Sequence, residues 1–228
     1  MSATRKLARY AGLLYVLMSI PGVYGLIYVP SKLIMAGDSA ATAHNIQASE
    51  TLFRSGIVAN LVSQAGFILV ALALYRLLKH VNQMLALLML IWIAISIPIV
   101  FVAEAHLLGI PALLDPNGPA AALGETGRIA MSALSLRAYS NTIQTAEIFW
   151  GLWLIPMGLL IYRSGFLPRF LGVLLFLAAI GYLIECIPLL VPAYAKAAGT
   201  IASPLRALEL VIPLWLLIAG AKDQPLPD

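Results

Sequence analysis

The sequence predicts an all-α fold: an integral membrane bundle of six transmembrane helices, with short interfacial helices in the two long outer loops. Of its 228 residues, 61% are hydrophobic and 11% charged, whereas soluble domains average about half apolar and about a quarter charged. A mean hydropathy of +0.94 agrees, because a chain of this length cannot bury so much apolar surface in water. Each predicted span is long enough to cross about 30 Å of hydrocarbon. The spans are 9–29, 54–78, 84–107, 140–162, 168–191 and 204–221.

The first span follows a basic stretch that contains Arg5, Lys6 and Arg9. A charged start before an apolar run is also typical of a signal peptide. No small-x-small cleavage site follows, however, and the run is long enough to span a bilayer. We therefore expect an uncleaved first transmembrane helix.

The two long connections contain helix signals of their own. In "GDSAATAHNIQASETLF", Asp38 or Ser39 is expected to cap an interfacial helix over 40–50 that leads into the second span. The second connection has the turn signal "LLDPNGP", followed by "GETGRIAMSALSLRAYS", which predicts another short interfacial helix. We expect 1–222 to form one membrane domain and 223–228 to be a disordered tail.

Basic residues in the short loops predict the orientation, because Lys and Arg are enriched on the cytoplasmic side. They lie before the first span, after the second, between the fourth and fifth, and after the sixth. Both termini are therefore predicted to be cytoplasmic. The net charge of +4 comes from scattered residues without a basic run, so nucleic acid is not an expected partner.

Every predicted span except the second has an internal proline. Each proline removes one backbone hydrogen bond and leaves the carbonyl four residues earlier without its helical donor. Pro188 would release the carbonyl of Ile184, and Pro213 that of Glu209. Packing kinks and a gating role both stay open. The prolines are Pro21, Pro98, Pro156, Pro188 and Pro213.

With this topology, the polar residues of the spans gather in the outer half of the bilayer. Ionisable groups are costly in hydrocarbon, so they should face the bundle interior or a wet cavity. Asn60 and Gln64 are i, i+4, and Gln144 and Glu147 are i, i+3, which places each pair on one helical face. We therefore predict an outward-facing polar pocket. Its residues are Arg54, Asn60, Gln64, Glu104, Gln144, Glu147, Glu185, Arg206 and Glu209.

Carboxylates sharing one pocket need compensation by arginine, by protonation of some members or by a bound cation. Arg206 and Glu209 are i, i+3 and are expected to pair locally. Glu147 and Glu185 have no local partner, so a ligand-binding role and a buried ion pair both remain open for them.

Motifs for catalysis are absent from the sequence. There is no HExxH motif, serine nucleophile elbow or glycine-rich phosphate loop, and the single cysteine, Cys186, excludes an internal disulfide. Glu104 and His106 are about 200° apart around a helix and cannot easily share one metal. We therefore assign no catalytic residues and expect neither a metal nor a cofactor.

Two stretches resemble the bacterial membrane-protein family catalogued as domain of unknown function 4386. They are "ETLFRSGIVANLVSQAGFILVALALYRLLKHVNQMLALLML" and "EIFWGLWLIPMGLLIYRSGFLPRFLGVLLFLAAIGYLIE". The resemblance covers 5–221, and "YRSGFLPRFLG" is its most specific part. The resemblance implies a multi-helix membrane protein. It does not identify any functional residue of this chain.

The leading functional hypothesis is binding or transport in the lipid bilayer. Glu147, Glu185 and Glu209 would attract a small cation, an amine or a lipid headgroup, which the amide side chains would orient. One alternative is an enzyme that acts on a lipid or quinone at the outer leaflet. Another is a structural or partner-binding subunit whose acids pair with arginines, and no protein partner is assigned.

Overall fold

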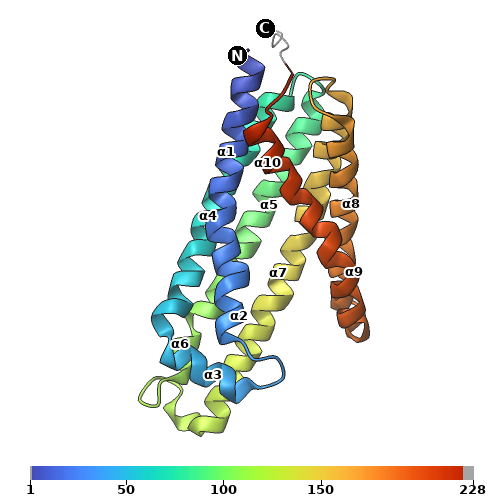
Figure 1. Ribbon diagram of the computed structural model, residues 1–228. Coiled ribbons are helices and arrows are strands. Elements are labelled where there is room, and N and C mark those ends of the chain that lie inside the picture. The colour runs from blue at the N-terminus through green and yellow to red at the C-terminus, as the bar shows by residue number, and fades with distance from the viewer. Residues whose placement is uncertain (1, 223–228) are drawn as a thin grey trace. The chain divides into compact units, whose positions relative to one another are not determined.

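The computed structural model describes residues 2–222 (Figure 1). These residues form helices and turns, without any strand, and six helical segments are long and apolar enough to cross a membrane. The predicted all-α fold with six spans is thereby confirmed, while the predicted tail at 223–228 lies outside the described residues. The six segments are Ala3–Leu33, Glu50–Leu78, Gln83–Leu114, Ala121–Arg163, Arg169–Leu189 and Pro192–Ile218.

The described chain divides into two compact units. Within the described residues, unit 1 comprises 2–18, Ala65–Pro98 and 144–222, and unit 2 comprises Ser19–Gln64 and Ile99–Ile143. The single membrane domain expected over 1–222 stays a prediction. The long helices that contribute residues to both units are α1 (Ala3–Val23), α4 (Glu50–Leu78), α5 (Gln83–Leu108) and α7 (Gly124–Arg163).

Within unit 2, the first span changes its helical form. A π-helix, η1 (Tyr24–Tyr28), follows α1, and α2 (Val29–Leu33) comes next with Pro30 in its first turn. The N–H of Val29 donates to the carbonyl of Tyr24, five residues earlier. Such π turns are rare and occur frequently at functional sites.

The capped helix predicted in the first long connection is present. It is α3 (Ser39–Ala48), and the side chain of Asp38 accepts a hydrogen bond of 2.8 Å from the N–H of Ala41. That contact satisfies one of the backbone donors left over at a helix start. Only Ser49 separates α3 from α4, which begins at Glu50 and has this negative charge in its N-terminal turn.

The second long connection differs from the prediction. Its short helix is α6 (Ile110–Leu114), followed by the 3₁₀ turn η2 (Ala121–Leu123). The stretch expected to be a separate interfacial helix is instead the first part of α7, which continues through the fourth span. No proline interrupts the sequence between Gly124 and Ile155, so nothing in the backbone forces the expected break.

The α-helix of the fifth span ends earlier than predicted. Helix α8 (Arg169–Glu185) stops at Glu185, and two 3₁₀ turns, η3 (Ile187–Leu189) and η4 (Pro192–Tyr194), follow it. Pro188 therefore lies in η3, inside the fifth span (Arg169–Leu189) but after its α-helical part has ended. Glu185 is thus the last residue of its helix.

The sixth span begins earlier than predicted, at Pro192 in the η4 turn. It contains α9 (Ala195–Ala207), the 3₁₀ turn η5 (Leu208–Leu210) and α10 (Val211–Ile218). Helices α8 and α9 lie side by side (Figure 1). The span ends before Gly220, whose positive φ of 69° suits a residue that closes a helix.

Glycines allow close helix packing in unit 1. A Cβ atom at Gly172 of α8 would lie 2.6 Å from the carbonyl oxygen of Gly158 on α7. On α1, a Cβ atom at Gly12 would lie 2.4 Å from the backbone nitrogen of Leu217. Such contacts between small residues are typical of helices that associate in a membrane, where close van der Waals packing drives association.

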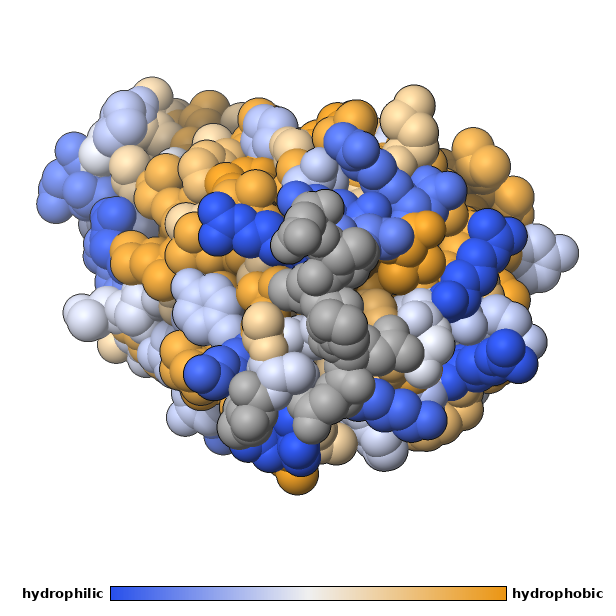
Figure 2. All heavy atoms as spheres, turned by 90° about the horizontal axis from the view of Figure 1, so that it is seen from above, coloured by the Kyte–Doolittle hydropathy of each residue, from blue (hydrophilic) through white to orange (hydrophobic). Residues whose placement is uncertain are grey.

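Basic residues gather at one end of unit 1, where α1 and α8 begin and α4, α7 and α10 end (Figure 1). Figure 2 looks onto this end and shows hydrophilic side chains (blue) among apolar ones. The orientation is predicted from Lys and Arg residues that the sequence places on one side of the membrane, and the structure places these residues at one end of unit 1. The basic residues are Arg5, Lys6, Arg9, Arg76, Lys79, Arg163, Arg169 and Lys222.

Candidate functional site

In unit 1, a single guanidinium lies between two carboxylates. Arg206 Nη1 on α9 is 3.2 Å from Glu147 Oε1 on α7 and 3.3 Å from Glu185 Oε2 at the end of α8. The exposed fraction of the side chain is 7% for Glu147, 21% for Glu185 and 31% for Arg206. Arg206 is therefore the nonlocal partner that sequence spacing could not assign to either glutamate.

A third carboxylate in unit 1 is held by two tyrosines. Glu209, in the η5 turn, accepts a hydrogen bond from the hydroxyl of Tyr15 on α1 and another of 2.8 Å from the hydroxyl of Tyr182 on α8. The expected local ion pair between Arg206 and Glu209 is not found among residues 2–222. Tertiary packing supplies partners on other helices, and these replace the i, i+3 contact.

Aromatic rings surround these charges. The guanidinium of Arg206 lies 4.9 Å from the ring centroid of Tyr182, within cation–π range. Trp150 meets the same ring edge-on at a centroid distance of 6.2 Å. We call Glu147, Glu185, Arg206 and Glu209, together with Tyr15 and Tyr182, the acid–tyrosine cluster.

The cluster has buried polar atoms whose hydrogen-bonding capacity is unused. Within the described chain, Glu147 Oε2 and the indole Nε1 of Trp150 have no hydrogen-bond partner. Glu185 Oε2 lies within ion-pair distance of Arg206 but makes no hydrogen bond with suitable geometry. Buried polar atoms in folded proteins are nearly always satisfied, so such atoms indicate a place where a ligand or water can bind.

Gln144, also predicted as a pocket residue, takes part through its backbone. Its carbonyl oxygen accepts a contact of 3.3 Å from the thiol of Cys186, which also lies 3.2 Å from the carbonyl oxygen of Tyr182. This contact joins α7 to the end of α8 next to Glu185. Cys186 is a free thiol in this structure.

In unit 2, the fourth buried carboxylate pairs with an amide. Asn60 Nδ2 on α4 donates to Glu104 Oε1 on α5, and the exposed fractions are 0% for Asn60 and 1% for Glu104. Gln64, one turn further along α4, is also buried. Arg54 instead forms an exposed ion pair of 2.6 Å with Glu50 on its own helix.

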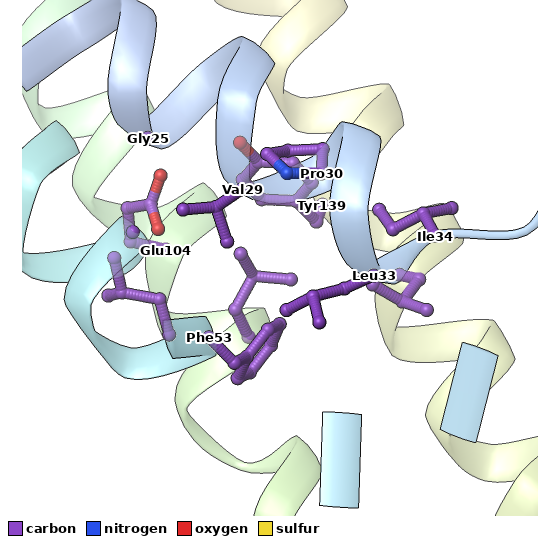
Figure 3. A pocket seen from close by; sticks show the side chains of 12 residues that line it. Gly25, Val29, Pro30, Leu33, Ile34, Phe53, Glu104 and Tyr139 are labelled. Carbon is purple, nitrogen blue, oxygen red and sulfur yellow. The ribbon is translucent and has the colours of Figure 1, made fainter. Parts of the chain in front are cut away.

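Glu104 also lines a small cavity of about 30 Å³ (Figure 3). Apolar side chains such as Val29, Leu33 and Phe53 form most of the remaining wall. Gly25 and Pro30, from η1 and α2, line the same cavity. The buried carboxyl group of Glu104 therefore faces a small cavity within unit 2.

The structure thus divides the predicted pocket residues between the two units. Gln144, Glu147, Glu185, Arg206 and Glu209 belong to unit 1, and Arg54, Asn60, Gln64 and Glu104 belong to unit 2. Glu147, Glu185 and Arg206 meet, as do Asn60 and Glu104.

Two residues of the cluster were missed by sequence reasoning: Tyr15 and Tyr182. A tyrosine hydroxyl inside an apolar span needs a hydrogen-bond partner, which was the available signal. Tyr182 also precedes Glu185 by three positions and therefore shares its helical face.

Comparisons with known proteins find a matching family and a relative of part of the chain. Residues 10–220 match the protein family described as Domain of unknown function (DUF4386). An uncharacterized protein of Archaeoglobus fulgidus is 36% identical over 87 residues, which cover 38% of this chain and 51% of that relative. The chain thus spans about half the length of this curated relative. No solved structure matches the chain.

Proposed function

The chain belongs to the DUF4386 family, and on that premise we propose that this multi-pass membrane protein binds a small organic cation at its acid–tyrosine cluster. The ligand class is a protonated or quaternary amine. The proposal rests on the charges and aromatic rings that the cluster brings together inside the membrane-spanning segments.

The observation that carries the proposal is an excess of carboxylates. Glu147 and Glu185 both contact the guanidinium of Arg206, and Glu209 is a third acidic side chain of unit 1 that forms no ion pair among residues 2–222. A buried anion without a cation is costly in hydrocarbon, and the tyrosine hydroxyls that hold Glu209 do not neutralise it. A bound cation would restore the balance.

Arg206 indicates which kind of cation suits the site. Its guanidinium contacts two carboxylate groups and lies over the ring of Tyr182. Carboxylates combined with an aromatic face are the groups with which proteins recognise alkylammonium ligands. We therefore expect an amine to bind beside Arg206 or to take over one of its two carboxylate contacts.

The partly exposed members provide the route into the cluster. The side chains of Arg206 and Glu185 keep exposed fractions of 31% and 21%, whereas that of Glu147 keeps 7%. Glu185 also ends its helix beside the η3 turn, so no further α-helical turn covers it. An amine would meet Glu185 first and Glu147 after it.

The test uses choline as the probe and the purified protein in detergent. We expect choline chloride to raise the unfolding temperature in a saturable way relative to caesium chloride at equal ionic strength. Combining Glu147→Gln with Glu185→Gln should weaken the apparent affinity at least about tenfold, which corresponds to about 1.4 kcal/mol. Isothermal titration calorimetry gives the dissociation constant directly.

Glu125→Gln is the matched control, because Glu125 is an exposed acid in the first turn of α7. It should leave choline binding unchanged. Equal choline affinity in the wild type and in the double glutamine variant would contradict the proposal and favour a purely structural ion pair. Co-purification of a stoichiometric protein partner through the cluster would favour the role of a partner-binding subunit.

The proposal includes an orientation, with both termini in the cytoplasm of a bacterial inner membrane. The basic residues at one end of unit 1 support it, because Lys and Arg are enriched on the cytoplasmic side. A green fluorescent protein fused after Asp228 should be fluorescent, and alkaline phosphatase at the same place should be inactive. A non-fluorescent fusion together with active alkaline phosphatase would show that the proposed orientation is inverted.

A further inference from the structure

A buried acid in unit 2 has no basic partner. Glu104 has an exposed fraction of 1%, and within residues 2–222 it forms no ion pair. Its one hydrogen bond comes from the neutral amide of Asn60. A carboxyl group at such a place in a membrane span must either take up a proton or bind a cation, because neither water nor lipid compensates its charge.

Three side-chain oxygen atoms on α4 and α5 can accept a hydrogen bond and do not receive one within the described chain. Glu104 Oε2, Asn60 Oδ1 and Gln64 Oε1 are buried and make no hydrogen bond within the described chain. Asn60 and Gln64 are one turn apart on the same face of α4. The carboxylate fixes the Asn60 amide with its nitrogen toward Glu104, because the reversed amide would place two oxygens against each other.

The cavity beside Glu104 sets the size of the ligand. Its volume of about 30 Å³ compares with the roughly 10–15 Å³ needed to hold one water. Figure 3 shows Glu104 at this cavity, with Val29 and Phe53 among the apolar side chains of the wall. A bare ion or an ion with one water fits this space.

The backbone of the first span can add a further oxygen. Pro30 has no N–H, so one carbonyl in the preceding π turn lacks its helical donor. Gly25 of that turn and Pro30 both line the cavity. At Gly25 the chain also runs close to α4, since a Cβ atom there would lie 2.5 Å from the carbonyl oxygen of Gly56.

Charge and donor type select the ion. Carboxylate, amide and carbonyl oxygens favour hard cations over transition metals. One carboxylate neutralises one positive charge, so a monovalent ion leaves the site neutral, whereas a divalent ion would leave a net charge in hydrocarbon. We infer that Glu104 and Asn60 form a binding site for one small alkali cation of the size of Na⁺, with Gln64 as a further oxygen donor.

The test compares NaCl with CsCl at equal ionic strength, using the full-length protein purified in detergent. We expect Na⁺ to raise the unfolding temperature by several degrees in a saturable way and Cs⁺ to have little effect. Glu104→Gln should abolish the Na⁺ response. Asn60→Ala keeps the carboxylate and should weaken the apparent Na⁺ affinity at least about tenfold. If Glu104→Gln fails to fold, Asn60→Ala provides the test of the site.

The double variant of Glu147→Gln and Glu185→Gln separates this site from the amine site. It should keep the full Na⁺ response although its choline affinity is weakened. Equal stabilisation by Na⁺ and Cs⁺, or a Na⁺ response unchanged in Asn60→Ala, would overturn the inference. Stabilisation by acid without any Na⁺ effect would also overturn it, because the compensating ion would then be a proton.

Discussion

Replacing Arg206 by alanine is expected to lower the free energy of unfolding by about 2–4 kcal/mol. The substitution leaves Glu147 and Glu185 facing each other without the guanidinium that contacts both. Removing one partner of a buried ion pair costs more than the pair contributes, because the remaining charge stays buried. The partial exposure of Arg206, 31%, keeps the loss below that of a fully buried pair. Unfolding in mixed micelles of dodecylmaltoside and SDS measures it.

Two further variants decide whether uncompensated charge causes the loss. Combining Arg206→Met with Glu147→Gln and Glu185→Gln removes all three charges and should recover most of the stability. Arg54→Ala is the control, because its ion pair with Glu50 is exposed and should contribute less than about 1 kcal/mol. A triple variant as unstable as Arg206→Ala would show that Arg206 acts through packing instead of charge.

Choline should also protect the Arg206→Ala protein. With the guanidinium gone, an external ammonium is the cation available to Glu147 and Glu185, so choline should restore part of the lost stability. This result would connect the stability of the cluster with the proposed amine binding.

The position of the candidate site could be predicted better than its pairing. Apolar periodicity with sparse charges located Glu147 and Glu185 inside spans, and the structure brings them together through Arg206. The partner of each acid could not be predicted, because helices distant in sequence supply it. Spacing favours local pairs such as Arg206 with Glu209, whereas the packed unit places Glu209 between two tyrosines.

The spans could be predicted from hydropathy, and their ends could not. Helix α8 stops at Glu185, although apolar residues continue beyond it, since Pro188 and Pro192 favour turns there. Helix α7, by contrast, is longer than predicted. It begins at Gly124 and includes the polar residues that were expected to form a separate helix. Hydropathy reports where a chain is apolar, whereas helix ends depend on backbone donors and breakers.

Trp153→Ala is expected to lower the free energy of unfolding by about 3–5 kcal/mol. The side chain of Trp153 has an exposed fraction of 0% and is among the largest fully buried side chains of the chain. Its ring meets Phe67 edge-on at a centroid distance of 5.1 Å and lies 6.1 Å from the ring of Tyr15. Truncation therefore removes contacts to two helices and leaves a void that close-packed neighbours cannot fill.

Trp153→Phe should cost less than about 1.5 kcal/mol, because it keeps an aromatic ring and most of the volume. The indole Nε1 of Trp153 has no hydrogen-bond partner within the described chain, so phenylalanine forfeits no hydrogen bond there. The void in Trp153→Ala also frees Tyr15, whose hydroxyl binds Glu209, so choline affinity should fall in the alanine variant and persist in the phenylalanine variant. Loss of stability without loss of choline affinity would show that Glu209 does not depend on this aromatic support. The same titration of both variants therefore measures how far core packing in unit 1 positions its acids.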